Sequence, residues 1–199
     1  MNLFITGTDT DAGKTTVAAW ICSRLKVPYW KLIQTGSDSD SATVQRLAPQ
    51  TPILPEAYRL RAPLSAWDAA RLEQVTVDPN RFQTPCTPCV IEGAGGLLVP
   101  IAEDFCMIDA LEQTQSTALI VARSKLGMIN HILLTVFALH QRQIPIAGIV
   151  ISGAIEPYIQ ETIEQFSKER IVAVLPESSD LPRLFERTPV PEAICKVLS

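Results

Sequence analysis

Short apolar runs alternate with longer amphipathic stretches along most of the chain. The runs are rich in Val, Ile and Leu and predict β-strands at Asn2–Thr6, Tyr29–Gln34, Pro88–Glu92, Ala118–Ala122, Ala147–Ser152 and Ile171–Leu175. The stretches between them have helical spacing and predict helices at Thr15–Leu25, Ser39–Leu47, Asp104–Thr114, Gly127–Gln141 and Pro157–Lys168. Because the runs are apolar throughout rather than alternating, we expect strands that are covered on both faces. This order predicts an α/β fold, with a doubly wound, mostly parallel sheet and helices on both faces.

Two segments depart from this alternation. Pro49–Pro88 is rich in proline and irregular apart from one predicted helix, Ser65–Gln74. We interpret it as an excursion packed on the core, because about forty residues rarely hold a core alone. The tail, Pro176–Ser199, carries four prolines and then a short amphipathic helix. With 199 residues in all, we expect one domain, residues 1–199.

Composition and sequence pattern argue against two classes of partner, nucleic acids and membranes. Apolar residues make up 47% of the chain and charged residues 19%, which is ordinary for a globular α/β protein. The net charge of −4 and the lack of any Lys or Arg run argue against nucleic-acid binding. No apolar stretch reaches the about 18–20 residues that span a bilayer, and the N-terminus lacks the basic region of a secretory signal. We therefore expect a cytoplasmic protein that binds neither nucleic acid nor membranes.

The cysteines give little support for either a disulfide framework or a metal site. There are five, an odd number, and they are scattered along the chain. Cys86 and Cys89 have the spacing of a metal or redox pair, but zinc would need a second pair or nearby histidines. The two histidines, His131 and His140, lie far along the chain, so we favour a core position for Cys89.

Gly7–Thr15, which reads Gly-Thr-Asp-Thr-Asp-Ala-Gly-Lys-Thr, lies between the first predicted strand and the first predicted helix. A strand, a tight loop ending in Gly-Lys-Thr and a helix are typical of a phosphate-binding loop, because free N–H groups and the helix dipole favour an anion. Gly13 lets the backbone curl around the phosphate, Lys14 would reach the β- and γ-phosphates, and the Thr15 hydroxyl would bind Mg²⁺. Gly7 and Gly13 are separated by five residues, one more than usual. The context still favours nucleotide binding over a chance Gly-Lys-Thr.

Charged side chains follow the next two predicted strands, where ligands bind in such sheets. Lys31 is placed to balance charge on a transferring phosphoryl group, although a surface lysine would fit the sequence equally well. Asp40 opens a helix, where it would either cap the helix or bind Mg²⁺. Glu92 ends the third strand and would come close to Thr15. Three oxygen donors, Thr15, Asp40 and Glu92, would suit Mg²⁺ together with phosphate and water.

Taken together, three segments resemble the dethiobiotin synthetase family. They are the loop Thr6–Thr15 with its longer glycine spacing, Glu92-Gly-Ala-Gly-Gly96 and Leu126-Gly-Met-Ile-Asn-His131, in the family's order. A fourth segment, Tyr58–Ala70, is similar to the family's Pro-x-Ser-Pro region in a degraded form. The resemblance extends over most of the chain, up to Pro176.

The resemblance implies a ligase of biotin biosynthesis. CO₂ would add to an amine of 7,8-diaminononanoate to give a carbamate, and ATP would phosphorylate that carbamate. The second amine would then close the ureido ring, giving dethiobiotin with release of ADP and phosphate. A homodimer is implied as well, because in the family the turn after the fourth strand belongs to the neighbouring subunit and receives the substrate's carboxylate at a helix N-terminus.

The resemblance also implies a role for each matching residue. Lys14 and Lys31 would be catalytic and stabilise the charge of phosphoryl transfer, and Thr15, Asp40 and Glu92 would hold Mg²⁺. The diamine substrate and its carbamate would contact Thr10, Asp11, Thr35, Gly127 and Asn130. The nucleotide would be bound by Asp11, Ala12, Gly13, Lys14, Thr15, Thr16, Asp40, Glu92, Gly93, Ala94, Gly95, Ser152, Gly153, Leu175, Pro176 and Glu177.

The chain departs from the family pattern where the base is read. Ser152-Gly153 stand where many members carry an Asn-Asp pair that reads adenine, and Glu177 stands where an aromatic residue often follows Pro176. Because that amide and carboxylate are gone, we expect a relaxed nucleotide preference, with CTP or GTP accepted besides ATP. The base would be read mainly by backbone groups near Pro176. Leu32 also replaces a proline after the catalytic lysine, which removes no functional group.

Three other classes of protein fit these residues less well. Partition-type ATPases carry a second lysine five residues before the loop lysine, whereas Asp9 occupies that position here, and no basic amphipathic helix ends the chain. Ligases that depend on a glutaminase domain, such as cobyrinic acid synthase, would need more than 199 residues. A catalytically silent nucleotide-binding relative would not need Lys31 and the metal-binding acids.

Overall fold

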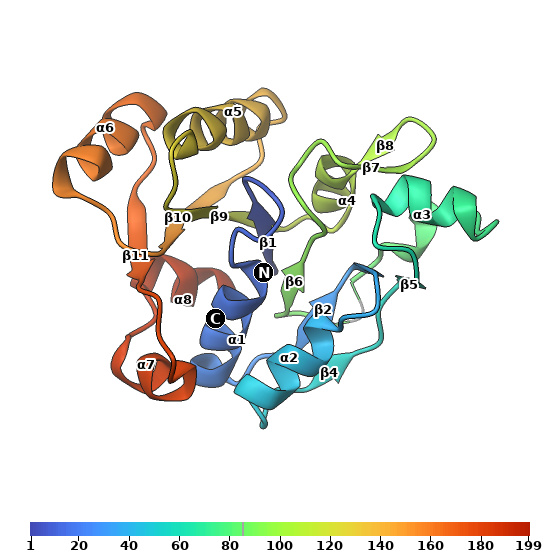
Figure 1. Cartoon of the computed structure of the whole chain (residues 1–199), viewed down its shortest axis with the longest axis horizontal. Coiled ribbons are helices and arrows are strands. Elements are labelled where there is room, and N and C mark those ends of the chain that lie inside the picture. Colours follow the sequence, from blue (N-terminus) through green and yellow to red (C-terminus); the bar gives the residue numbers. More distant parts are fainter. Residues whose placement is uncertain (85) are drawn as a thin grey trace.

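Seven parallel strands form the central sheet of the computed structural model, which describes residues 1–84 and 86–199 (Figure 1). Their order across the sheet is β11–β10–β9–β1–β6–β2–β4. The bounds of these strands are β1 Leu3–Gly7, β2 Tyr29–Lys31, β4 Ile53–Leu54, β6 Val90–Glu92, β9 Thr117–Arg123, β10 Ile146–Ser152 and β11 Ile171–Leu175. All carboxyl ends therefore meet at one edge, as the predicted parallel sheet requires.

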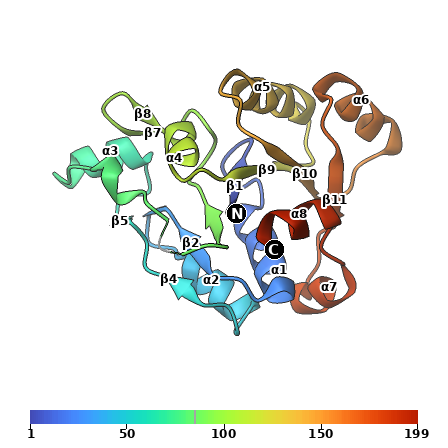
Figure 2. The ribbon, with the colours of Figure 1, turned by 180° about the vertical axis from the view of Figure 1, so that it is seen from behind.

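Helices cover both faces of this sheet, which confirms the predicted fold class (Figures 1 and 2). Side chains alternate between the faces, so that Leu3 and Ile5 join one core cluster and Phe4 joins the other. The first cluster is closed by α1 Lys14–Leu25, α2 Asp40–Leu47, α7 Leu181–Arg187 and α8 Glu192–Leu198. The second is closed by α3 Ala66–Leu72, α4 Met107–Gln113, α5 Met128–Gln141 and α6 Pro157–Ser167.

The prediction of one strand over Tyr29–Gln34 is wrong, because two short strands occupy this stretch. β2 ends at Lys31, and β3 (Ile33–Thr35) pairs instead with β5 (Tyr58–Leu60) in a separate two-stranded sheet. The Leu32 N–H still donates to the Glu92 carbonyl, but the Leu32 carbonyl accepts from Ala57 N. The chain therefore leaves the central sheet at Leu32, and Lys31 lies at its carboxyl edge.

The Pro49–Pro88 excursion packs on the core as expected, but it is more regular than its sequence predicted. It supplies β4 at the edge of the central sheet, β5, α3 and a 3₁₀ turn at Pro79–Arg81. The Ser65 side chain caps α3 by accepting a hydrogen bond from Asp68 N. Tyr58 and Phe82 are buried members of the larger core cluster, and Phe82 stacks on Phe105 with ring centroids 5.9 Å apart, so these side chains attach the excursion to the core.

Two further helix predictions need correction. The helix expected over Asp104–Thr114 begins only at Met107, after a hairpin of β7 (Pro100–Ala102) and β8 (Phe105–Cys106). A capping box sets this start, because Asp109 Oδ2 accepts a hydrogen bond from Cys106 N at 2.7 Å. The tail holds two helices rather than one, and the Asp180 side chain caps the first, α7.

Candidate active site

The loop between β1 and α1 crosses the carboxyl edge of the sheet and ends in glycine at the helix start. Gly13 precedes α1 with φ of 96°, in the left-handed region. A Cβ on Gly13 would lie 2.7 Å from Ser152 Oγ at the end of β10. Glycine is therefore required at this position by both its φ and its close approach to β10.

A cavity of about 410 Å³ opens at the N-terminus of α1. Twelve of its lining residues belong to the expected site: Thr10, Asp11, Gly13, Lys14, Thr15, Thr16, Lys31, Thr35, Asp40, Glu92, Ala94 and Gly95. Two other residues of the expected nucleotide site, Ala12 and Gly93, are buried and do not line this cavity. Ile33 and Gln34 also line the cavity, although no sequence motif pointed to them.

Lys31 lies between two carboxylates inside this cavity. Its Nζ is 2.6 Å from Asp40 Oδ2 and 3.0 Å from Glu92 Oε1, and it donates to the Gly93 carbonyl at 3.1 Å. Lys31 is only 3% exposed, so the surface-lysine interpretation is wrong. Burial alone would lower the pKa of Lys31, but Glu92 and Asp40 outweigh it and raise that pKa above its ordinary value. Lys31 therefore carries a charge in the interior.

Thr15 brings its hydroxyl to the same two acids. Thr15 Oγ1 lies 3.0 Å from Asp40 Oδ1 and 2.9 Å from Glu92 Oε1, so the three expected metal-binding oxygens converge. The hydroxyl has a single proton and can donate to only one of these oxygens at a time. Burial would raise the pKa of Asp40, but Lys31 outweighs it and the pKa is lowered.

Asp40 does not cap its helix, so the capping role expected as one alternative is wrong, and its role as a Mg²⁺ ligand stays a prediction. Ser39 is the N-cap of α2, and its side chain accepts a hydrogen bond from Ala42 N. Asp40 is the first helical residue, and its backbone N–H donates to Gln34 Oε1 at 2.9 Å. Its carboxylate is therefore turned away from the helix and toward Lys31 and Thr15.

Tyr29 belongs to this cluster although it was predicted only as part of a strand. Its hydroxyl donates to Glu92 Oε2 at 2.8 Å, and both residues are fully buried. Burial, followed by the charge of Glu92, raises the pKa of Tyr29 well above its ordinary value, so the phenol stays a neutral donor. Strand alternation places Tyr29 and Lys31 on one face, which was the available signal.

Lys14 points back onto its own loop. Its Nζ donates to the Asp9 carbonyl at 3.4 Å, and burial followed by the charge of Lys31 lowers the pKa of Lys14. The Asp9 side chain pairs with Lys125 Nζ at 2.6 Å and accepts a hydrogen bond from Thr10 N. Asp9 therefore holds the first half of the loop against the start of α5, a contact that the sequence did not reveal.

Comparisons with known proteins agree with this geometry. Residues 1–183 match the AAA domain family. The chain is 46% identical over 175 residues to the ATP-dependent dethiobiotin synthetase BioD of Paramagnetospirillum magneticum, a match that covers 86% of this chain and 85% of that protein. It is 40% identical over 185 residues to BioD of Brucella ovis, with 90% and 87% covered. This chain belongs to the dethiobiotin synthetase family.

Solved structures share the fold at much lower identity. The septum site-determining protein MinD of Pyrococcus horikoshii, complexed with Mg-ADP, has a TM-score of 0.58 at 15% identity and covers 89% of this chain and 82% of its own. A ParA family ATPase of Chlorobium tepidum has a TM-score of 0.57 at 12% identity and covers 99% and 90%. At such identities the likeness concerns the fold alone.

The remaining residues expected from the dethiobiotin synthetase family lie outside the 410 Å³ cavity. Five of them lie at the ends of β10 and β11: Ser152, Gly153, Leu175, Pro176 and Glu177. The Gly153 N–H is already used, because it donates to the Leu175 carbonyl at 2.8 Å. Glu177 Oε1 lies 3.8 Å from Nη2 of Arg123 at the end of β9, and both side chains are exposed.

Gly127 and Asn130 also lie apart from that cavity, at the start of α5. Gly127 caps the helix with φ of 92° and lines a separate cavity of about 360 Å³. A Cβ on Gly127 would meet no atom within 4 Å, and Asn130 is exposed. The residues that the family assigns to a neighbouring subunit are thus open at the surface of this chain.

Proposed function

We propose that the chain is a dethiobiotin synthetase, an ATP-dependent and Mg²⁺-dependent cyclo-ligase made of one domain. It would carboxylate 7,8-diaminononanoate with CO₂, phosphorylate the carbamate and close the ureido ring. The observation that carries this proposal is the buried contact of Lys31 with both Asp40 and Glu92, beside Thr15 and the phosphate loop. A protein that only bound a nucleotide would have no use for a second buried lysine among these acids.

The oxygen donors of the site fit Mg²⁺. Hydroxyl and carboxylate oxygens are its preferred protein ligands, and Thr15 Oγ1 lies within 3.0 Å of one oxygen from each acid. Within residues 1–84 and 86–199, no group of three or more His, Cys, Asp or Glu could hold a metal by itself. We infer that Thr15, Asp40 and Glu92 hold Mg²⁺ together with the nucleotide's phosphates, whose charge the ion would neutralise.

Lys14 and Lys31 would supply positive charge to the transferring phosphoryl group. Both side chains are buried, where a charge interacts more strongly than in water, and Lys31 keeps its proton because its pKa is raised. In the structure Lys31 neutralises Asp40 and Glu92. In the loaded enzyme it would turn toward the phosphoryl group and leave the two carboxylates to the cation.

The substrate's amine end would bind on the open side of the same cavity. Thr10, Asp11 and Thr35 line it and are partly or fully exposed. The Asp11 carboxylate would attract the ammonium groups of the diamine, and the two threonine hydroxyls would bind the carbamate oxygens. The family resemblance implies these roles, and the types and positions of the three residues support them.

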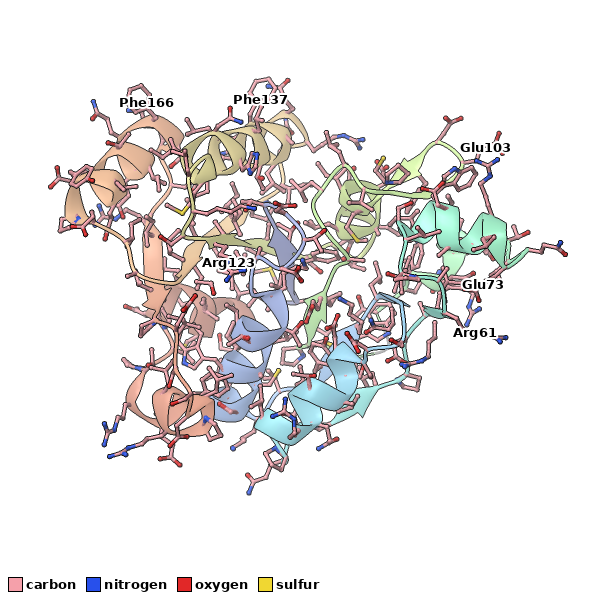
Figure 3. The ribbon with its side chains drawn as sticks, viewed as in Figure 1. Arg61, Glu73, Glu103, Arg123, Phe137 and Phe166 are labelled. Atoms are coloured by element: carbon pink, nitrogen blue, oxygen red, sulfur yellow. The ribbon has the colours of Figure 1, made fainter. Side chains whose placement is uncertain are left out.

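A homodimer would complete the site with Gly127 and Asn130 of a second subunit. Two observations support it: these residues lie apart from the Lys31 cavity of their own chain, and two large apolar side chains of the helix that follows Gly127 are exposed. Leu134 and Phe137 on α5 are 58% and 62% exposed, and Phe137 projects away from the sheet (Figure 3). A helix face of this kind is typical of a buried interface.

The nucleotide base would lie on the other side of the phosphate loop. Lys31, Asp40 and Glu92 mark the γ-phosphate side, so the nucleoside would extend over the ends of β10 and β11. Ser152 offers one hydroxyl there and the Gly153 N–H is occupied, which supports a relaxed preference among ATP, CTP and GTP.

The location of the enzyme in the cell is also part of the proposal. None of the helices in the described residues has the length and apolar character needed to cross a bilayer. We propose a cytoplasmic enzyme whose partners are small molecules and a second copy of itself, rather than nucleic acid or a membrane.

Phosphate release tests this function. Purified protein is incubated with ATP, Mg²⁺ and bicarbonate, with and without 7,8-diaminononanoate, and inorganic phosphate is measured. We expect release that depends strongly on the diamine. Release that is indifferent to the diamine would instead indicate a switch-type ATPase, and no release would indicate a silent nucleotide-binding protein.

A further inference from the structure

The two oxygens of the buried Glu92 carboxylate have different partners. Oε1 accepts hydrogen bonds from Thr15 Oγ1 at 2.9 Å and from Lys31 Nζ at 3.0 Å, and both of these side chains line the cavity. Oε2 accepts a hydrogen bond from the Tyr29 hydroxyl at 2.8 Å, and Tyr29 does not line the cavity. Oε1 is therefore the oxygen on the cavity side, and Oε2 is anchored in the core.

Strand register brings Tyr29 to this oxygen. Lys31 pairs with Glu92 and Tyr29 pairs with Val90 across β2 and β6, so Tyr29 lies two residues before Lys31 on the same face. Two residues of a strand rise by about 7 Å, so the donor at this position must be a long side chain with its polar group at the tip. Tyr29 and Glu92 are both 0% exposed, which leaves neither of them to solvent.

We propose that Tyr29 is a positioning residue for the metal, whose hydroxyl fixes the Glu92 carboxylate so that Oε1 stays directed at Thr15, beside which the cation would bind. This inference rests on the proposed Mg²⁺-dependent phosphoryl transfer. When Lys31 turns toward the phosphoryl group, Glu92 loses its ion-pair partner, and the Tyr29 hydroxyl still holds Oε2. Groups that orient a metal ligand in this way are worth about 10- to 100-fold in metal affinity or activity.

The variant Tyr29→Phe tests this role because it removes one oxygen and keeps the ring that packs in the core. Tyr58→Phe is its matched control, since Tyr58 is also buried and its hydroxyl accepts a hydrogen bond from Asp78 N at 2.8 Å, away from the cavity. The measurement is the affinity for Mn²⁺ in the presence of ADP, from the electron paramagnetic resonance of free Mn²⁺. We expect about tenfold weaker Mn²⁺ binding for Tyr29→Phe and no change for Tyr58→Phe.

A double variant tests whether the effect passes through Glu92. In a Glu92→Gln background, Tyr29→Phe should weaken Mn²⁺ binding no further, because the carboxylate it orients is absent. A further tenfold loss in that background would overturn the proposal, and so would a single Tyr29→Phe variant that binds Mn²⁺ as the wild type does. Equal losses in Tyr29→Phe and Tyr58→Phe would also overturn it, since they would report a general effect on packing.

A measurement on protein that keeps Tyr29 covers the case in which Tyr29→Phe does not fold. The chain has three tyrosines, Tyr29, Tyr58 and Tyr158, so labelling with 3-fluorotyrosine gives three ¹⁹F resonances. Tyr58→Phe and Tyr158→Phe assign them. We expect the Tyr29 resonance alone to shift when Mg²⁺ is added to the ADP complex, and an unmoved Tyr29 resonance would overturn the proposal.

None of these readouts requires the diamine or turnover. Weaker Mn²⁺ binding by Tyr29→Phe in a protein that makes no dethiobiotin would support the role of Tyr29 and reject the ligase function. Diamine-dependent phosphate release together with unchanged Mn²⁺ binding would do the reverse.

Discussion

The two ends of the proposed nucleotide site are built differently. At the phosphate end, Lys31, Asp40, Glu92, Thr15 and Tyr29 hold one another through contacts of 2.6–3.0 Å, and Lys31, Glu92 and Tyr29 are buried. At the base end, the ion pair of Arg123 with Glu177 spans 3.8 Å, and both of its side chains are exposed.

The two ends should therefore differ in how much the function depends on any single contact. In the buried cluster every group depends on its neighbours, so the loss of one partner leaves an unpaired charge in the interior. An exposed ion pair contributes little, because water and salt screen it. Phosphoryl transfer should therefore be sensitive to single substitutions, whereas the identity of the base should matter much less.

The largest effect is expected for Lys31→Ala at the phosphate end. We predict that kcat for diamine-dependent phosphate release falls by about 10²–10³, as loss of one charge-stabilising group typically does, with ATP affinity largely intact. The control is Lys196→Ala, whose ammonium pairs with Glu192 on the exposed surface of α8. Turnover of Lys31→Ala within about threefold of the wild type would contradict the catalytic role of Lys31.

Gly13→Ala tests the contact between the two ends of the site, because the added Cβ would lie 2.7 Å from Ser152 Oγ at the base end. The left-handed φ costs a non-glycine residue about 1–2 kcal/mol, and the loop can relieve this strain and the clash only by moving its N–H groups away from the phosphate position. We therefore predict that ATP affinity falls by about tenfold or more. Adding Ser152→Gly should recover part of this loss by removing the clash.

Isothermal titration calorimetry with ATP measures this loss, and Gly36→Ala is the control variant. Gly36 has a φ of 82°, but its Cβ would meet Pro63 only at 3.6 Å, an ordinary contact. Equal ATP affinities for Gly13→Ala and the wild type would mean that Ser152 does not constrain the phosphate loop.

Asp40→Asn should reduce stability in a pH-dependent way. The pKa of Asp40 is lowered in the folded protein, since Lys31 outweighs the opposing effect of burial. Such a group contributes stability above its ordinary pKa of 3.8 and loses it as the pH falls through the lower folded value. We predict that wild type exceeds Asp40→Asn by about 1–3 kcal/mol in free energy of unfolding near neutral pH.

Urea unfolding followed by circular dichroism between neutral and acidic pH checks this prediction. The difference between the two proteins should shrink as the pH falls below 3.8, because Asp40 is then becoming neutral in the wild type as well. A difference that stays constant with pH would show that the Asp40–Lys31 pair does not account for the stability.

The smallest effects are expected at the base end. We predict kcat/KM values for ATP, CTP and GTP within about 100-fold of one another, since few side chains there can discriminate between bases. Glu177→Gln should change each value by less than about threefold, because its partner Arg123 is exposed and distant. A larger preference for ATP would mean that groups other than Ser152 and Glu177 read adenine.

Much of the phosphate end could be predicted from the sequence because its residues follow local rules. The glycine at the helix start, the lysine after it and the acid at a strand end each have a chemical reason to occupy that position. In the structure Lys31 and Glu92 are register partners on β2 and β6, so their contact follows directly from the parallel sheet.

The rest depended on contacts between distant segments. The break at Leu32 arises from pairing of β3 with β5, about 25 residues further along, which no local pattern in Tyr29–Gln34 indicates. Asp9 and Lys125 are 116 residues apart in sequence. Tyr29 resembled any apolar strand residue, and only the register with β6 reveals that its hydroxyl meets a buried carboxylate.

The most direct test of the proposed function follows the carbon of the substrate into the product. Wild type and Lys31→Ala are incubated with ATP, Mg²⁺, 7,8-diaminononanoate and ¹³C-bicarbonate, and the products are examined by mass spectrometry. We predict labelled dethiobiotin from the wild type, with its formation reduced by about 10²–10³ in Lys31→Ala. No labelled ureido product from the wild type, or undiminished formation by Lys31→Ala, would contradict a carboxylating ligase centred on this buried lysine.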